Sequence, residues 1–354
     1  MTICSSTVKA RPLSRMRHSA MAACVAALTS LPAPRAHADD VEQFYKGKSI
    51  RVVVGHSAGG GYDLYARLLS KHIRRHIPGQ PTIVPQTMTG AGGLRVTNYL
   101  YSQAPKDGTV IGTFSRSIPT MPLLTPPGTF DARQFTWLGS MSGDTSLCLT
   151  GRNSAVKTWQ DMLTKPVIMG GQAVGTDSDI YARLYKNVFG AKMRIVSGYP
   201  GTTEIRLAME RGEVDGICGL SWGTVKVSNP EWRKNKTVNF LLQAGLRMNP
   251  ELSDVPFALD LVKEPEKKQI LYLHFAPQAM GRPFAAPPDI PADRKAALLT
   301  AFDRTMKDPE LLAEAKKSGM DIDPMTGGQI HALLEQIYAT SPAVVAQAAR
   351  AIAD

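Results

Sequence analysis

The segment at residues 55–59 places a serine in a spacing that nucleophilic enzymes use. Three valines at 52–54 lead into Gly-His-Ser-Ala-Gly, which matches the G-x-S-x-G nucleophile elbow of serine hydrolases. In that chemistry a sharp turn between a strand and a helix presents the serine hydroxyl to a histidine base. The motif raises the hypothesis that Ser57 is a nucleophile.

The position of this motif in the chain argues against a hydrolase. Only one strand candidate precedes Ser57, and no earlier segment has a motif that would form an oxyanion hole. An acid and a histidine should follow the serine, but His274 and His331, the late candidates, stand in no supporting motif. A secreted serine hydrolase that uses Ser57 is retained as the alternative function.

The glycines that continue this turn favour contact between a ligand and the backbone. Gly59, Gly60 and Gly61 stand where a helix is expected to begin, so bare N–H groups and the positive end of the helix dipole are accessible. Such a helix start attracts an anion by roughly 0.3–2 kcal/mol. The spacing fits neither G-x-x-x-x-G-K-[ST] nor G-x-G-x-x-G. A tight turn without a ligand is the plainer interpretation.

A second segment of the chain repeats this arrangement. Residues 167–189 resemble residues 52–73: each reads as a strand, a glycine turn and a helix, and D-L-Y-A-R-L at 63–68 is matched by D-I-Y-A-R-L at 179–184. Two such helix starts facing each other would clamp a carboxylate. Asp63 and Asp179 fit helix caps better than ligands, because Asp is favoured at helix starts.

Hydrophobic spacing predicts two α/β blocks with parallel strands joined by helices. The first block has expected strands at 50–54, 82–85 and 109–114, and helices at 64–77 and 94–101. The second has expected strands at 166–169, 194–197, 214–218 and 240–245, and helices at 156–163, 178–189 and 203–211. One long helix at 293–317 and a last helix from Gln329 complete the chain.

The first 38 residues have the pattern of an export signal. Basic residues precede the short apolar run 19–31, and Ala36-His37-Ala38 fits the small-x-small cleavage pattern. The whole chain has a formal charge of +11, from 41 Lys and Arg against 30 Asp and Glu; without the five basic residues of this segment, 36 remain against 30. The basic residues are dispersed and no nucleic-acid-binding motif is present, so no nucleic acid partner is expected.

Two cysteines, Cys148 and Cys218, remain after the predicted cleavage. The chain has no C-x-x-C motif, and neither a metal nor a cofactor is expected. An oxidising compartment would permit a disulfide between the two cysteines, but two separate buried thiols fit the sequence at least as well.

Several ordered segments resemble one family of receptors. They are the signal-like start, "FYKGKSIRVVVGHSAGGGYDLYARLL", "MTGAGGLRVTNYL", "APKDGTVIGT", "SGYPGTTEIRLAMERGEVDGIC" and the tail at 281–319. Together they resemble the solute-binding receptors of tripartite tricarboxylate transporters, also called Bug proteins. The resemblance covers nearly the whole chain after the signal.

This resemblance implies an α/β fold of the periplasmic-binding-protein type, with two Rossmann-like lobes that are joined by crossing strands and close like a flytrap. The expected division is 1–38 as the signal peptide, 39–143 with 271–354 as lobe 1, and 144–270 as lobe 2. It implies ligand-binding residues at Ser57, Gly59, Gly60, Gly61, Tyr62, Asp63, Gly90, Ala91, Gly92, Gly93, Ser115, Arg116, Gly175, Thr176, Asp177, Ser178, Tyr199, Pro200, Gly201, Thr202, Ser221 and Trp222.

The resemblance also implies what the protein does. We expect a periplasmic, monomeric receptor without enzymatic activity that captures a small organic acid for an integral-membrane transporter of one small and one large subunit. A sensor that signals instead of serving transport is equally compatible with the sequence. Tyr62 stands where the family often has a small residue, and Asp177 and Asp179 would repel a dianion. The ligand is therefore expected to be bulkier, less charged or partly aromatic.

Overall fold

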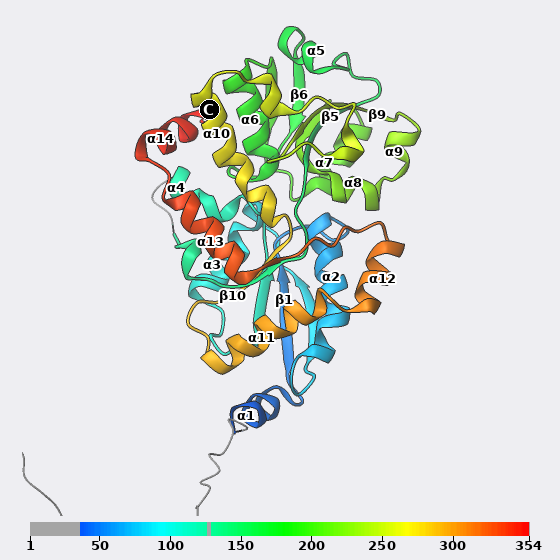
Figure 1. The fold of residues 1–354 in the computed structure, drawn as a ribbon. Helices are drawn as coiled ribbons and strands as arrows, with labels where there is room; N and C mark the ends of the chain where they lie inside the picture. The colour runs from blue at the N-terminus through cyan, green and yellow to red at the C-terminus, as the bar shows by residue number, and fades with distance from the viewer. Residues whose placement is uncertain (1–35, 126–128, 354) are drawn as a thin grey trace, which may run out of the picture. The chain divides into compact units, whose positions relative to one another are not determined.

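Two β-sheets covered by helices organise the chain in the computed structural model, which describes residues 36–125 and 129–353 (Figure 1). Within these residues, sheet A has the strand order β11-β4-β10-β3-β1-β2 and sheet B the order β7-β6-β8-β5-β9. The strands of sheet A are β1 (Ser49–Val54), β2 (Thr82–Thr87), β3 (Val110–Thr113), β4 (Thr136–Ser140), β10 (Pro283–Ala286) and β11 (Met325–Thr326). Those of sheet B are β5 (Ser146–Gly151), β6 (Val167–Gly170), β7 (Met193–Val196), β8 (Gly216–Ser221) and β9 (Val238–Ala244).

Helices cover both sheets, and we refer to each sheet with its helices as lobe A or lobe B. The helices before strand β4 are α1 (Ala36–Tyr45), α2 (Gly61–Ile73), α3 (Leu94–Ser102) and α4 (Met121–Leu124). Those between the strands of sheet B and after them are α5 (Trp159–Thr164), α6 (Asp177–Phe189), α7 (Thr202–Glu210), α8 (Trp222–Ser228), α9 (Glu231–Lys234) and α10 (Pro265–Phe275). The C-terminal helices are α11 (Ala292–Thr305), α12 (Pro309–Lys317), α13 (Gly327–Tyr338) and α14 (Pro342–Ala351).

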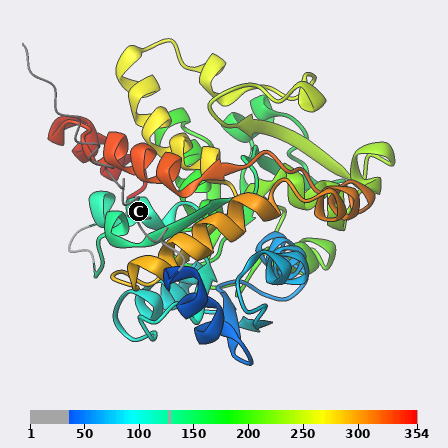
Figure 2. The same cartoon turned by 60° about the horizontal axis from the view of Figure 1, so that its bottom comes forward.

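Strand β1 lies inside sheet A, and its valines are buried on both faces of the sheet. It pairs in parallel with β2 and β3. Val52 and Val54 pack with α2 and α11, whereas Val53 packs with α3. Continuous apolar runs of this kind are typical of strands covered by helices on both sides. In Figure 2 the covering helix α11 (orange) and α1 (dark blue), which contact each other, lie at the near end of lobe A.

Lobe B repeats this arrangement, which gives the sequence repeat a structural counterpart. Strand β6 lies between β7 and β8, with parallel pairing on both sides, as β1 lies between β2 and β3. Each of these strands leads through a glycine turn into a helix, α2 in lobe A and α6 in lobe B. The two strand–turn–helix units therefore have the same position in the two sheets.

Both sheets are mixed, which corrects the expectation of parallel sheets. β10 runs antiparallel to β3 and β4, and β5 runs antiparallel to β8 and β9. The predicted helix at 293–317 is also two helices, because α11 ends before Asp308 and Pro309 begins α12. The Asp308 side chain accepts a hydrogen bond from Glu310 N–H, and proline is favoured in the first turn of a helix.

The chain crosses between the sheets at residues 141–145 and 276–282. These two crossings are hydrogen-bonded to each other, by Met141 N–H to Arg282 O and by Asp144 N–H to Gln278 O. Farther along the chain, α14 packs against α10, α4 and α6, as Figure 1 shows at the C-terminus. The lobe boundaries given in the sequence analysis stay a prediction.

The predicted signal peptide lies largely outside the described residues, which start at Ala36. Helix α1 includes the predicted cleavage pattern at 36–38. Among the residues that the structure describes, none of the helices has both the length and the apolar character to cross a membrane.

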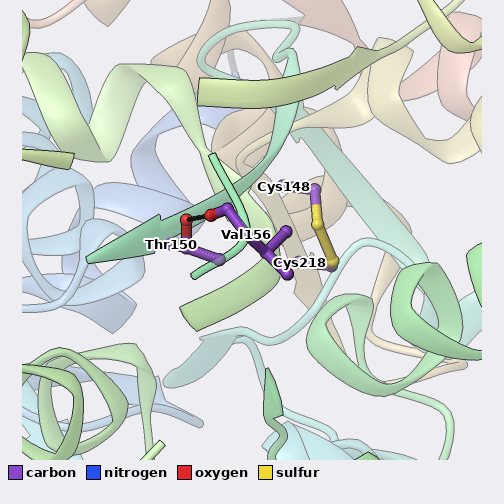
Figure 3. Close-up of a disulfide and its surroundings, with 4 residues drawn as sticks. All are labelled: Cys148, Thr150, Val156 and Cys218. Carbon is purple, nitrogen blue, oxygen red and sulfur yellow. Dashed lines mark hydrogen bonds between the residues drawn. A yellow bond between two sulfur atoms is a disulfide. The ribbon is translucent and has the colours of Figure 1, made fainter. Parts of the chain in front are cut away.

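The sulfur atoms of Cys148 and Cys218 form a disulfide between neighbouring strands of sheet B (Figure 3). The two residues are register partners in the β5–β8 pair, and both are fully buried. Beside them Thr150 Oγ1 donates a hydrogen bond to Val156 O, with 2.6 Å between the oxygens. Of the two arrangements that the sequence left open, the structure has the disulfide.

Candidate functional site

A small cavity lies between the lobes, at the starts of α2 and α6. Its volume is about 30 Å³, which is room for roughly two water molecules. The expected organic acid needs more room than this, so lining side chains or the lobes must shift when it binds. The cavity is lined by His56, Ser57, Gly60, Gly61, Tyr62, Ser115, Arg116, Gln172, Asp177, Thr202, Gly219, Leu220, Ser221, Thr224 and Arg282.

The two glycine turns beside this cavity are held by equivalent hydrogen bonds, each from a glycine N–H to an aspartate four residues later. In lobe A the Gly59 N–H donates to Asp63 Oδ2 at 2.9 Å, and in lobe B the Gly175 N–H donates to Asp179 Oδ2 at 3.1 Å. Both glycines have positive φ angles, of 74° and 84°, which suit glycine. Asp63 also pairs with Arg67. The Asp63 and Asp179 carboxylates thus fix the turns, and they contact their own lobe.

Two buried arginines meet two buried aspartates at the cavity. Arg116 Nη1 and Arg282 Nη2 lie 3.1 and 2.8 Å from the same oxygen, Asp144 Oδ2. Arg116 Nη2 also lies 2.6 Å from Asp177 Oδ2, which comes from lobe B. Both arginine side chains are 1% exposed. Charges so deeply buried are stable only when they are paired and hydrogen-bonded.

The two aspartates differ in how well their charges are compensated. Burial by itself would raise the pKa of Asp144, but Arg282 and Arg116 outweigh it and lower that pKa. For Asp177 burial is the larger effect. It raises the pKa of this carboxyl, and Arg116 offsets the rise only in part. Asp144 is therefore the firmly held carboxylate, and Asp177 is the weakly compensated one.

His56 is a neutral hydrogen-bond donor at the cavity. Burial, with smaller effects from Arg282 and Arg116, lowers its pKa to about 3. Its ring stacks on Tyr62, with 4.2 Å between ring centroids. Gln172 Nε2 lies 3.4 Å from His56 Nδ1. Because the amide nitrogen donates to Nδ1, the imidazole hydrogen is on Nε2, which lacks a partner among the described residues.

Two buried neutral histidines make stability depend on pH. Burial lowers the pKa of His274 to about 4 and that of His56 to about 3, whereas a histidine in the unfolded chain titrates near 6.5. The unfolded state therefore binds more protons below pH 6.5, and stability falls as the pH falls. We expect each histidine to remove about 2 kcal/mol of unfolding free energy between pH 7 and 5.

Urea unfolding at both pH values measures this effect. The His274→Gln variant should lose about 2 kcal/mol less than the wild type on acidification, whereas the exposed His331→Gln control should behave like the wild type. An equal loss in wild type and His274→Gln would contradict the prediction.

The hydrolase alternative finds little support in the geometry of Ser57. Its hydroxyl donates to Glu204 Oε2 at 3.0 Å, across the lobes. The late histidines have other partners: His274 Nε2 lies 3.1 Å from Ala348 O, and His331 lies beside Glu335. His56 is too strongly shifted toward the neutral form to hold a proton near neutral pH.

The structure brings part of the predicted site together at the cavity. The predicted residues that line it are Ser57, Gly60, Gly61, Tyr62, Ser115, Arg116, Asp177, Thr202 and Ser221. The other predicted residues do not line it: Gly59, Asp63, Gly90, Ala91, Gly92, Gly93, Gly175, Thr176, Ser178, Tyr199, Pro200, Gly201 and Trp222. Their role in ligand binding stays a prediction.

Several of these other residues have structural contacts of their own. A Cβ on Gly92 would overlap the Thr176 side chain of the other lobe. The Ser178 hydroxyl accepts a hydrogen bond from Gln172 N–H at 2.9 Å. Trp222 donates through its indole N–H to Glu251 at 2.5 Å, and neither residue lines the cavity.

The sequence did not predict six of the cavity residues, which are His56, Gln172, Gly219, Leu220, Thr224 and Arg282. Arg282 had a signal: it is a charged residue directly before the buried strand β10, where charge is rare without a partner. His56 stood inside the serine motif and was considered only as part of it. Gln172 and Thr224 reach the cavity through tertiary packing, for which the sequence holds no spacing signal.

A larger groove of about 1570 Å³ lies beside the crossings. It contains one predicted site residue, Trp222, and charges that are already paired, such as Lys226 with Glu251 and Asp321. The smaller cavity has the helix starts of both lobes and the buried arginines, and we take it as the candidate site.

Comparison with solved structures decides the fold. The periplasmic binding protein BugD aligns with a TM-score of 0.69 at 18% identity, over 87% of this chain and 98% of BugD. A Rhodopseudomonas palustris protein solved with adipate gives 0.67 at 16% identity, over 86% and 97%. The fold is that of a periplasmic binding protein. MatC from the same organism, solved with bound malate, gives 0.64 at 18% identity, over 84% of this chain and 99% of MatC.

A curated relative extends the comparison to sequence. The UPF0065 protein in the gbd 5' region of Cupriavidus necator is 28% identical over 144 residues. The matched segment covers 41% of this chain and 42% of that relative, so the chain spans about two fifths of the relative's length. No protein-family model matches the chain. The predicted resemblance to Bug-type periplasmic binding proteins, with their two-lobed α/β fold, is confirmed.

Proposed function

We propose that this chain is a periplasmic receptor that captures a small organic acid between its lobes. By the family resemblance, it would deliver the acid to a tripartite transporter with one small and one large membrane subunit. The main support is the cavity between the starts of α2 and α6, where two buried arginines and a neutral histidine present donors. The malate and adipate in related structures belong to those proteins, and they make organic acids the first ligands to test.

Ligand binding without turnover is the expected behaviour. A panel of mono-, di- and aromatic carboxylates should contain at least one acid that raises the melting temperature and gives a saturable calorimetric isotherm. The acid should be recovered unchanged. A panel without any binder would overturn the proposal, and labelling of Ser57 by a covalent serine probe would favour the hydrolase instead.

Close packing of glycines suggests that closure of the lobes is part of binding. Gly61 stands at the start of α2. A Cβ on this residue would overlap Thr224 Oγ1 of lobe B, because it would lie much closer than the 3.4 Å of ordinary contact. A Cβ on Gly201 would likewise overlap Ser57 of lobe A. In a receptor of this kind a ligand favours the closed state because both lobes complete its contacts.

The Gly61→Ala variant tests this closure. We expect ligand affinity to fall by about 5- to 150-fold, because overpacking typically costs about 1–3 kcal/mol. The melting temperature without ligand should not fall, since alanine is favoured over glycine within a helix. Calorimetry with the strongest acid of the panel measures the affinity. Gly223→Ala is the control, because its nearest neighbour would be Ser221 Oγ at 3.6 Å; equal affinities of the two variants would contradict the prediction.

A further inference from the structure

The charges within the ion-pair network at the cavity cancel, and this restricts the charge of a ligand that contacts the network. Arg116 and Arg282 are opposed by Asp144 and Asp177, all four within one chain of ion pairs. Arg116, Arg282 and Asp177 line the cavity itself, while Asp144 joins the two guanidinium groups through a single oxygen. A ligand with a net charge would leave that charge uncompensated in a buried site.

Three buried nitrogen donors at this cavity lack a hydrogen-bond partner within the described part of the chain. They are Arg116 Nε, Arg282 Nε and His56 Nε2. Their residues are at least nine-tenths buried and line the cavity. Buried donors are almost always satisfied in proteins, so the group that completes this site should be an acceptor. A carboxylate has two oxygens and fits a set of arginine and imidazole donors.

Asp177 is the group that a second carboxylate would disturb. It is held by one arginine and accepts from Ser115 Oγ at 3.5 Å. Asp144 is held by two arginines and accepts from Thr145 N–H at 2.8 Å. Its side chain is 11% exposed, against 4% for Asp144. Arg116 already pairs with both Asp144 and Asp177. A ligand carboxylate on the same guanidinium would be the third and would bring a negative charge without a partner.

The possible ligand classes differ in what they bring to this site. A dicarboxylate adds two negative charges and a simple monocarboxylate adds one, and an unpaired buried charge costs several kcal/mol. An acid that also has an ammonium group supplies the missing partner. Building on the receptor function proposed above, we propose that the site selects a small zwitterionic acid, with its carboxylate on Arg116, Arg282 and His56 and its ammonium group on Asp177.

Matched pairs of acids that differ by one ammonium group test this selection. Calorimetry would compare L-alanine with propionate and L-aspartate with succinate on the full-length mature protein. We expect the amino member of a pair to bind at least tenfold more tightly. In the Asp177→Asn variant the preference should shrink to about threefold or less, whereas Glu213→Gln, which removes an exposed carboxylate of lobe B, should keep it.

Each outcome has a distinct meaning. Equal or tighter binding of propionate or succinate would overturn the selection for a zwitterion and leave the receptor proposal standing. Binding of neither member of either pair, nor of any acid in the broader panel, would overturn the receptor proposal as well. If Asp177→Asn does not fold, wild-type titrations in two buffers of different ionisation enthalpy decide. A zwitterion should bind without net proton uptake, whereas uptake of one proton per bound acid would show that Asp177 is neutralised instead and would overturn the proposal.

Discussion

We expect the Asp144→Ala variant to lose roughly 3–5 kcal/mol of its free energy of unfolding, the typical effect of removing one partner from a buried ion pair. Asp144 holds two guanidinium groups that are almost fully buried. Without it, Arg282 would keep only neutral partners, the Ser221 and Thr224 hydroxyls and the Gly281 carbonyl. Asp144 lies in the first crossing and Arg282 at the end of the second, so the variant should also weaken the connection between the two crossings.

An exposed aspartate–arginine pair is the matched control for this variant. Asp254 pairs with Arg233 at the surface, with a side chain that is 70% exposed, and exposed pairs contribute roughly 0–1 kcal/mol. Urea unfolding of Asp144→Ala and Asp254→Ala at pH 7 should therefore separate the two by at least about 2 kcal/mol. Similar midpoints and slopes for both variants would show that the buried network contributes little.

Reduction of the Cys148–Cys218 disulfide should have an effect of similar size. The two cysteines are 70 positions apart, and closing a loop of that length removes chain entropy worth about 4 kcal/mol from the unfolded state. Urea unfolding of the oxidised and the fully reduced wild type measures this directly, because both forms keep nearly the same side-chain volume. Equal midpoints in the two forms would contradict the prediction.

The Cys148→Ala/Cys218→Ala variant then separates the cross-link from packing. Both cysteines are fully buried in the core of sheet B, so their removal also deletes contacts. We expect this variant to be less stable than the reduced wild type by a further 1–2 kcal/mol or so. A variant that matches the oxidised protein would rule out both contributions.

Many helix-forming and strand-forming patterns of both blocks could be predicted from the sequence. β1, β2, α3 and β7 lie within a few residues of their expected positions, because long apolar runs and glycine turns are local signals. Strands β4, β5 and β10 were not predicted. β10 has four residues, and its pairing with β3 and β4 depends on residues far away in the chain, which a local pattern does not contain.

At the candidate site, too, the local features could be predicted and the long-range contacts could not. Glycine turns and their helix starts are local, and Gly60, Gly61 and Asp177 were predicted where the cavity is. The ion-pair network is not local, since Arg116, Asp144, Asp177 and Arg282 come from four separate segments. An arginine before a buried strand signals that a partner exists, but only the fold shows which aspartate it is.

The strand order of the two sheets also sets an order in which the chain can fold. Sheet B is built from one continuous stretch, 146–244, whereas sheet A needs β10 and β11, at 283–286 and 325–326, next to strands from 49–140. During synthesis or export from the N-terminus, sheet B can complete its pairing while sheet A still lacks two strands. Chains truncated after residue 275 should therefore keep every strand of sheet B, but they would lack the last strands of sheet A and helix α14, which packs on α6 and α10.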